Sequence, residues 1–215
     1  MKTWPDCGPP MLYQVERLGD GIAAPAVVGN QAFTLSVLDG IEYVVAFNVE
    51  TGEREWSSRL GLPSDGYVAY HRLMRWLSQR TPTVYDGKLY AVTAYGLLVC
   101  FSCYDGKQVW SKDFGKEYGV TRQTWGFCDY PLVDEDVSIC VPGGSKATVV
   151  ALNRHTGDEV WRRVVASKTS TRLTRSAHTA TLRGSVQGLD YYVVGSDQDV
   201  YFINRTDGSL QIGQL

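Results

Sequence analysis

A hairpin pattern that occurs four times is the feature that most constrains how this chain can fold. Each copy has a short apolar run, a polar turn that contains glycine, and a second run that ends in a large apolar side chain. Such a pattern predicts two β-strands joined by a tight turn. The copies span residues 44–56, 98–110, 149–161 and 200–212, and their turn glycines lie 54, 51 and 51 residues apart.

Repetition at this spacing indicates a fold built from similar units of about 50 residues. Each unit also contains two earlier β-prone segments that are separated by short turns, so that one unit holds four strands. Four-stranded antiparallel sheets at this period are typical of the blades of a β-propeller. We therefore predict an all-β propeller with about four blades, at residues 23–58, 80–112, 129–163 and 177–213.

The residues shared by the four hairpins are expected to be structural. One blade cannot bury both faces of its sheet alone, so it must stack on its neighbours. A tryptophan at the same place in successive blades would fill the contact between them, whereas Ile212 in the fourth copy would fill it less well. The residues of this repeat motif are Ala46, Gly52, Trp56, Gly106, Trp110, Ala151, Gly157, Trp161 and Gly208.

The N-terminal residues contain a strand that belongs to none of the four predicted blades, which bears on whether the propeller is complete. Residues 1–9 predict a linker or frayed end, and residues 11–16 predict a lone outer strand with Tyr13 in the aromatic position. Closed propellers pair their first and last strands. Because this strand has no matching inner strands, we expect an incomplete propeller, about half of an eight-bladed ring. A four-bladed ring with a spare strand, or two chains that complete one ring, are the alternatives.

Composition excludes several classes of protein. The net charge of −2 predicts no binding to nucleic acid. No apolar run reaches the ~20 residues of a membrane-spanning helix, and residues 1–6 lack the apolar core of a signal peptide. The five scattered cysteines predict no disulfide framework. Cys100 and Cys103 have the spacing of a metal or redox pair, but in a strand they would point to opposite faces, so no metal site is predicted.

The connections between successive blades hold the candidate binding residues. These connections lie around the central funnel on one face of a propeller, and here they are rich in basic and aromatic side chains. Such a rim could attract a partner protein or a small anionic ligand. The alternative is a set of ordinary solvated loop residues. The candidates are Arg80, Arg122, Trp125, Arg172 and Arg175. An open blade face at the end of the array would in addition favour self-association.

The repeated hairpin resembles the tryptophan-docking motif of the pyrroloquinoline-quinone-like (PQQ-like) propeller repeat family. That motif consists of Ala, then Asp or Asn, then Thr or Asp followed by Gly, and finally Trp. Residues 46–56 and 151–161 match it closely, and residues 100–110 and 202–212 match it more loosely. The resemblance covers residues 10–212, and it implies a bacterial protein with a periplasmic or extracellular location.

The resemblance implies one of two functional lines. Quinoprotein dehydrogenases hold the quinone and a calcium ion on the propeller axis, next to a catalytic Asp and a pair of adjacent cysteines. The other line is non-enzymatic and uses the propeller to hold partners, as does the propeller lipoprotein of the outer-membrane β-barrel assembly machine.

The residues of this chain favour the non-enzymatic line. The sequence has no adjacent cysteines, and no acidic cluster outside its turns that would suit calcium. No nucleophile motif surrounds His71, His155 or His178, so a hydrolase triad is not predicted either. We predict a binding scaffold without catalytic or metal residues and without PQQ or calcium. A fragment of a PQQ-dependent quinoprotein dehydrogenase is the alternative.

Overall fold

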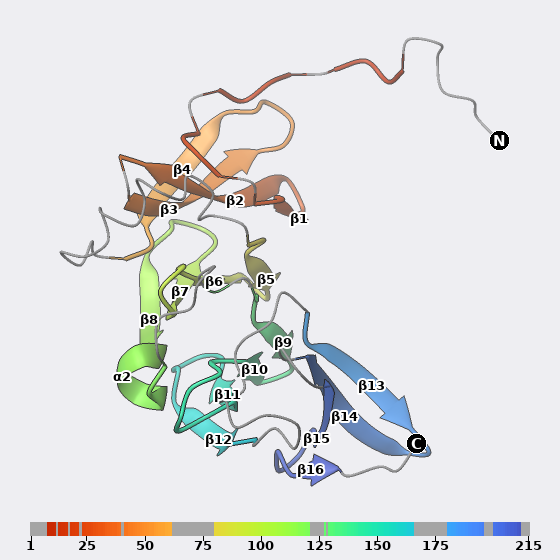
Figure 1. The fold of residues 1–215 in the computed structure, drawn as a ribbon. Coiled ribbons are helices and arrows are strands. Elements are labelled where there is room, and N and C mark those ends of the chain that lie inside the picture. The colour runs from red at the N-terminus through yellow and green to blue at the C-terminus, as the bar shows by residue number, and fades with distance from the viewer. Residues whose placement is uncertain are drawn as a thin grey trace.

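Four antiparallel sheets of four strands each make up most of the described chain. The computed structural model describes residues 8–11, 13–16, 18–21, 23–39, 41–61, 80–120, 127, 129–165, 180–195 and 200–211. Within each sheet the strands lie side by side in sequence order. The sheets follow one another along an arc, from β1–β4 to β13–β16 (Figure 1). The predicted all-β fold of propeller blades is therefore confirmed.

The sheets are called blades 1 to 4 in chain order. Blade 1 consists of β1 (Ala26–Val28), β2 (Gln31–Leu38), β3 (Ile41–Asn48) and β4 (Arg54–Arg59). Blade 2 consists of β5 (Thr83–Tyr85), β6 (Lys88–Val92), β7 (Leu97–Ser102) and β8 (Gln108–Asp113). Blade 3 consists of β9 (Leu132–Asp134), β10 (Val137–Cys140), β11 (Val149–Asn153) and β12 (Glu159–Arg163). Blade 4 consists of β13 (Leu182–Val186), β14 (Leu189–Gly195), β15 (Val200–Asn204) and β16 (Leu210–Gln211).

A short helix, α2 (Phe114–Tyr118), follows blade 2. The carboxylate of Asp113 caps its N-terminus by accepting a hydrogen bond from the backbone N–H of Lys116. Gly119, in the left-handed conformation, ends the helix. Within the described part of the chain, no helix has the length and apolar character that crossing a membrane requires.

The turn between the third and fourth strands of a blade explains why asparagine recurs in the repeat. In blade 3, the side-chain oxygen of Asn153 accepts hydrogen bonds from the backbone N–H groups of His155 and Thr156. Asn48 and Asn204 make the same pair of bonds in their own turns. This is the local turn chemistry for which asparagine is favoured.

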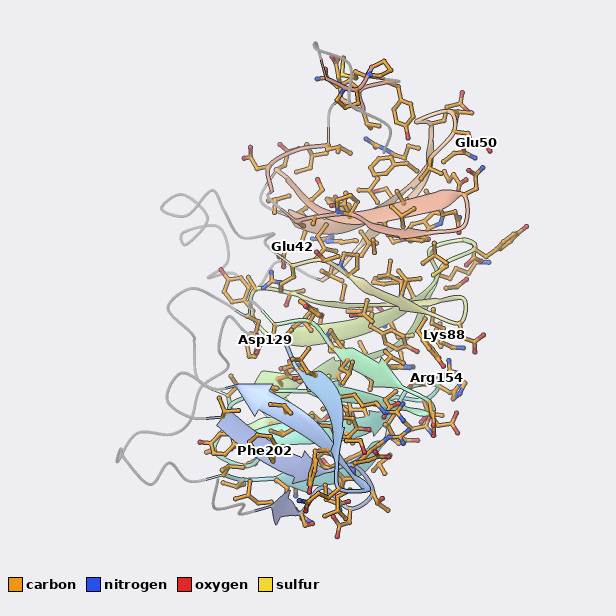
Figure 2. All side chains as sticks on the ribbon, turned by 90° about the vertical axis from the view of Figure 1, so that its right-hand side faces the viewer. Glu42, Glu50, Lys88, Asp129, Arg154 and Phe202 are labelled. Atoms are coloured by element: carbon orange, nitrogen blue, oxygen red, sulfur yellow. The ribbon has the colours of Figure 1, made fainter. Side chains whose placement is uncertain are left out.

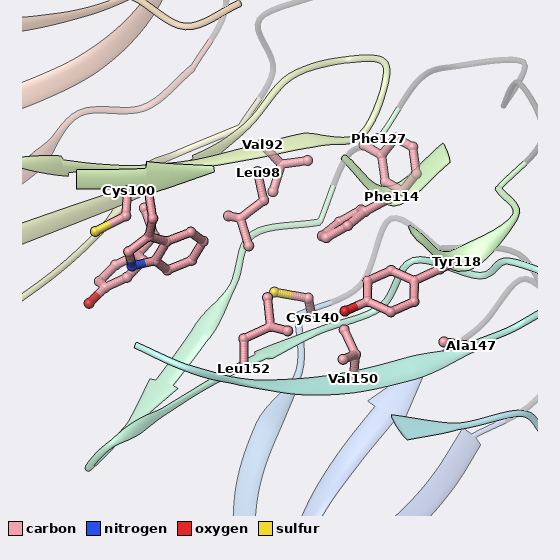
Figure 3. Packing of buried hydrophobic residues seen from close by; sticks show 12 residues of the cluster. Val92, Leu98, Cys100, Phe114, Tyr118, Phe127, Cys140, Ala147, Val150 and Leu152 are labelled. Carbon is pink, nitrogen blue, oxygen red and sulfur yellow. The ribbon is translucent and has the colours of Figure 1, made fainter. Parts of the chain in front are cut away.

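The hydrophobic core lies between the blades. Alternate side chains of each inner strand face opposite neighbours, because successive residues of a strand point to opposite sides of its sheet. Three clusters result, one at each contact between blades, and Figure 2 shows the sheets stacked in this way. Between blades 2 and 3, for example, Val92 and Leu98 meet Cys140, Val150 and Leu152 (Figure 3).

The N-terminal segment packs on blade 1 without forming the strand predicted for residues 11–16. Residues 11 and 13–16, which the structure describes, do not lie in a strand. A strand forms only beside another strand to which it can hydrogen-bond. The described residues of this segment contact blade 1 through a bridge between Asp20 and Val37 and through a hydrogen bond from the Thr34 hydroxyl to the carbonyl oxygen of Ala23, among other contacts.

Candidate functional site

Each contact between neighbouring blades, here called a seam, is closed by an aromatic ring that rests on a turn glycine of the next blade. At Gly157 the backbone is left-handed, with φ of 78°. A Cβ added there would lie 2.7 Å from the indole ring of Trp110, which is closer than packed atoms allow. The glycine is therefore required both by its backbone conformation and by the approach of the ring. The three pairs are Trp56 with Gly106, Trp110 with Gly157, and Trp161 with Gly208.

A hydrogen bond to the main chain orients two of these rings. The indole Nε1–H of Trp110 donates to the carbonyl oxygen of Arg154 at 3.0 Å, and that of Trp56 donates to Cys103 at 2.9 Å. Because a buried indole N–H needs an acceptor, this bond removes the main cost of burying tryptophan in the seam. The acceptor in each case is the residue that follows the repeated Asn or Ser of the turn.

Tyr13 occupies the aromatic position predicted for it. Its ring rests on Gly52, and its hydroxyl donates to the carbonyl oxygen of Val49 at 2.6 Å, as the tryptophans do in the seams. Tyr13 remains 41% exposed, however, whereas Trp110 is 8% exposed. The motif therefore predicted the docking of the Tyr13 ring correctly, although residues 11 and 13–16 do not form a strand.

Arginines in the turns connect blades 3 and 4 to the blades before them. Arg154 of blade 3 bonds the carboxylate of Asp86 in blade 2 at 2.8 Å, and its guanidinium lies 5.0 Å from the ring centre of Tyr85. The hydrogen bond and charge of Arg154 lower the pKa of Asp86. We call such a contact an arginine latch. The equivalent turn position in blade 2 is Cys103, so the first seam has no such arginine.

The second latch is more extensive and lies at the seam between blades 3 and 4. Arg205 bonds both carboxylate oxygens of Asp134, at 2.5 and 3.2 Å. Asp134 also accepts hydrogen bonds from Arg183 at 3.0 Å and from the hydroxyl of Tyr192 at 2.8 Å. Burial alone would raise the pKa of Asp134, but the bonds from Arg205 and Tyr192 outweigh it and hold that pKa below its usual range.

A pocket of about 290 Å³ opens beside this second latch. Its acidic side chains outnumber its basic ones, and Arg205 binds three of the acids, since it also reaches Glu135 at 2.7 Å and Asp190 at 3.4 Å. The guanidinium is therefore held in place by carboxylates on three sides. The charged and aromatic residues that line the pocket are Asp134, Glu135, Asp136, Asp190, Tyr192 and Arg205.

Arg80, one of the predicted rim residues, does not have the exposed position that the rim hypothesis requires. Its side chain is 2% exposed and pairs with Glu42 of blade 1 at 3.1 Å. Glu42 also accepts a hydrogen bond from the backbone N–H of Ala94 in blade 2. Arg80 therefore belongs to a buried ion pair across the first seam, because a charge buried at this depth requires a partner. The other candidates, Arg122, Trp125, Arg172 and Arg175, lie outside the described residues, so their role stays a prediction.

Cys100 and Cys103 contact different cores, as predicted, although Cys103 lies in the turn that follows β7 and not in the strand itself. Cys100 packs between blades 2 and 3, and Cys103 packs between blades 1 and 2. Burial raises the pKa of the Cys100 thiol to about 12 and that of Cys103 to about 11. Cys100 and Cys103 therefore do not form the adjacent pair that the resemblance to the dehydrogenases would imply. Among the described residues, no group of three or more His, Cys, Asp or Glu side chains is placed to hold a metal ion.

The chain matches a known family of propeller-repeat proteins. A family model of PQQ-type repeats, described as outer membrane protein assembly factor BamB, matches residues 40–213. The chain belongs to this family. The predicted membership of the PQQ-like propeller repeats is therefore confirmed.

Individual BamB proteins and a dehydrogenase are similar to the chain in sequence, in structure or in both. The assembly factor BamB of Burkholderia pseudomallei is 25% identical over 166 residues, which are 77% of this chain and 39% of that protein. The crystal structure of BamB from Moraxella catarrhalis has a TM-score of 0.57 and 19% identity, over 89% of this chain and 50% of that one. The quinohemoprotein alcohol dehydrogenase ADHIIG of Pseudomonas putida also has a TM-score of 0.57, with 15% identity, over 92% and 42%.

These coverages limit what the comparisons show. The chain spans about two fifths of the BamB from Burkholderia pseudomallei. At 19% and 15% identity, the two structural similarities show that the propeller fold is shared, and they do not establish a shared activity.

Proposed function

We propose that this chain is a non-catalytic propeller scaffold that binds a protein partner during outer-membrane protein assembly. The match of residues 40–213 to the BamB family model carries the proposal, because it covers blades 2, 3 and 4 completely and the last two strands of blade 1. The relative from Burkholderia pseudomallei is named as an outer-membrane protein assembly factor. A protein with this function would work in the periplasm.

The packing of the blades supports a scaffold role. Each seam combines an apolar cluster with an aromatic ring docked on a glycine, and the last two seams add an arginine latch. Contacts of this kind hold the turns in fixed relative positions, which lowers the conformational entropy that a partner must remove on binding. The predicted basic rim would present its charges from this rigid support.

The test is capture of partners from the periplasm. The chain would be exported with an affinity tag in a Gram-negative bacterium, crosslinked, purified and analysed by mass spectrometry. We expect enrichment of outer-membrane β-barrel proteins or of proteins that assemble them, relative to a tagged periplasmic protein of another fold. Reversing the charges of Arg122 and Arg175 together should reduce this enrichment if the rim is the contact surface. Equal recovery by the control protein would contradict the proposal.

A fragment of a quinoprotein dehydrogenase remains the second candidate. The Pseudomonas putida enzyme has the same TM-score of 0.57 as BamB from Moraxella catarrhalis, so the fold alone does not separate the two functions. Adding PQQ and calcium to the purified chain and following dye-linked alcohol oxidation separates the two functions. We expect no turnover above the rate of the cofactor alone, and measurable turnover would favour the dehydrogenase.

A further inference from the structure

Arg154, the arginine of the first latch, is only partly satisfied by the residues around it. Its side chain is 9% exposed, and its Nη2 bonds Asp86. The Nε and Nη1 atoms are shielded from solvent, and within the described part of the chain no acceptor bonds them. The Tyr90 hydroxyl lies beside the guanidinium, but it donates its own proton to the carbonyl oxygen of Arg154 at 3.1 Å. A buried, charged N–H group without an acceptor costs free energy, because it has lost its hydrogen bonds to water.

Arg205 holds the equivalent position one seam further along and bonds carboxylates with all three of its side-chain nitrogens. Its Nε and Nη2 form a fork on the carboxylate of Asp134, and the same Nη2 also bonds Glu135 at 2.7 Å. Arg154 has the counterpart of the second contact, namely its bond from Nη2 to Asp86. The carboxylate that would complete the fork at Nε is missing among the described residues.

The difference arises from one position at the end of the first strand of a blade. Asp134 ends β9 and pairs with Val137. Tyr85 ends β5 and pairs with Lys88 in the same register. Tyr85 therefore stands where Asp134 stands one blade later. Its ring, with its centre 5.0 Å from the Arg154 guanidinium, offers a π-face and no carboxylate.

The second open nitrogen, Nη1, has an acid at the expected position, but that acid is engaged elsewhere. The backbone N–H of Arg205 donates to the carbonyl oxygen of Asp190, whose carboxylate reaches Nη1 of the same arginine at 3.4 Å. The backbone N–H of Arg154 likewise donates to the carbonyl oxygen of Asp136. The Asp136 carboxylate, however, pairs with the ring of His155.

The charges at this turn also favour an anion. Arg154 and Lys88 both lower the pKa of Asp86, so two cations lie near one carboxylate. At the second latch, three carboxylates surround Arg205, and Arg183 is the second cation. The middle seam therefore has an excess of positive charge where the last seam has an excess of negative charge. Figure 2 shows Lys88 and Arg154 along the same edge of the stack.

We propose that Arg154 binds the carboxylate group of a ligand through its Nε and Nη2, in the fork geometry that Arg205 makes with Asp134. The ligand takes the place of the missing aspartate, and the ring of Tyr85, which is 42% exposed, turns outward to admit it. A charge-assisted fork is stronger than the contact of a guanidinium with a partly exposed ring, so the exchange is favourable. The carboxylate belongs to a small organic acid or to an acidic side chain of a protein. This site depends neither on the basic rim nor on the proposed role in outer-membrane protein assembly.

The first experiment follows the Nε–H resonance of Arg154 by NMR in the full chain with isotopically labelled arginine, and Arg154→Lys assigns that resonance. Sodium acetate should shift the resonance in a saturable way, whereas sodium chloride at the same ionic strength should not. The Nε–H of Arg205 is the internal control, which should not move because its fork is already occupied. No shift at Arg154, or an equal shift in chloride, would overturn the proposal and leave water as the partner of these N–H groups.

Substitution of Tyr85 tests the fork itself. In Tyr85→Asp the introduced carboxylate should occupy Nε and Nη2 of Arg154, so acetate should no longer shift the resonance. Tyr85→Phe keeps the ring and should respond to acetate as the wild type does. A response of Tyr85→Asp as large as that of the wild type would contradict the proposed site.

A peptide probe distinguishes the two sources of the carboxylate. The peptide acetyl-Gly-Glu-Gly-amide carries one side-chain carboxylate and no free terminus. Half-saturation of the Arg154 shift at a lower concentration than with acetate assigns the site to an acidic protein segment, and half-saturation at a higher concentration assigns it to small organic acids. The uncharged control is acetyl-Gly-Gln-Gly-amide, and a shift with this control equal to that with the Glu peptide would overturn recognition of a carboxylate.

Discussion

At the scale of single residues, the turn glycines show how one position can serve two purposes. Gly157 and Gly87 both have a left-handed backbone, with φ of 78° and 70°. A Cβ at Gly157 would collide with Trp110, whereas a Cβ at Gly87 would meet no atom within 4 Å. The pair therefore separates the cost of backbone strain from the cost of blocking a docked ring.

Substitution of these two glycines by alanine should give unequal losses of stability. Gly87→Ala carries only the strain of the left-handed backbone, about 1–2 kcal/mol. Gly157→Ala adds an overpacked contact with Trp110, worth about 1–3 kcal/mol more. Urea unfolding of both variants measures the difference, and equal losses would show that the ring moves aside without cost.

At the scale of the element, the second latch predicts a dependence of stability on pH. The folded state holds the pKa of Asp134 below the ordinary aspartate value of 3.8. Asp134 therefore contributes stability above pH 3.8, and this contribution is lost as the pH falls through the lowered pKa. Asp134→Asn removes the ionised partner of Arg205, so its loss of stability should be largest at neutral pH and shrink below pH 3.8.

Unfolding of the wild type and of Asp134→Asn in urea between pH 7 and pH 2.5 tests this prediction. A difference between the two proteins that stays constant over this range would contradict it. Asp105→Asn is the comparison, because the partner of Asp105 is the exposed Lys107 of the same turn and not an arginine of another blade. Lys107 lowers the pKa of Asp105 to about 2, so this variant should show the same direction of pH dependence with a smaller amplitude, since solvent screens the pair.

The sequence predicted the blades but not the ionic contacts between them. The blades were predictable because their signals are local: turn residues, alternating apolar residues and a constant repeat spacing. The arginine latches were not, because Arg154 and Arg205 bond acids that lie 68 and 71 residues earlier. The burial of Arg80 has the same origin, since its partner Glu42 is 38 residues away and belongs to another blade. An arginine that directly follows the repeated Asn, at 154 and 205, was the available signal.

At the scale of the whole molecule, the core of the described residues consists of three separate clusters and not of one. Each blade therefore depends on its neighbours, and a weakened seam divides the stack at that point. Trp110 belongs to the cluster between blades 2 and 3, the middle seam. Loss of the Trp110 side chain should therefore weaken the contact between the two halves of the described molecule.

Trp110→Ala should destabilise the molecule by about 3–5 kcal/mol and reduce the cooperativity of unfolding. Hydrogen exchange should rise first in the strands of blades 2 and 3 that face the middle seam. Val109→Ala, a change at the exposed neighbour on the same strand, should alter stability by less than about 0.5 kcal/mol. A single unfolding transition with the slope of the wild type would contradict the division into halves.

The hydrogen bonds from the rings of Tyr13, Trp56 and Trp110 end on main-chain carbonyls and not on side chains. The residue that supplies the acceptor is therefore chemically unconstrained by the bond, and it is Val49, Cys103 and Arg154 in three successive blades. The bond therefore leaves this side chain available for a second contact: Cys103 packs in the cluster between blades 1 and 2, and Arg154 bonds Asp86 of the preceding blade. In protein engineering, the residue type at this turn position can accordingly be chosen for the contact that a seam requires, while the docked ring keeps its main-chain acceptor.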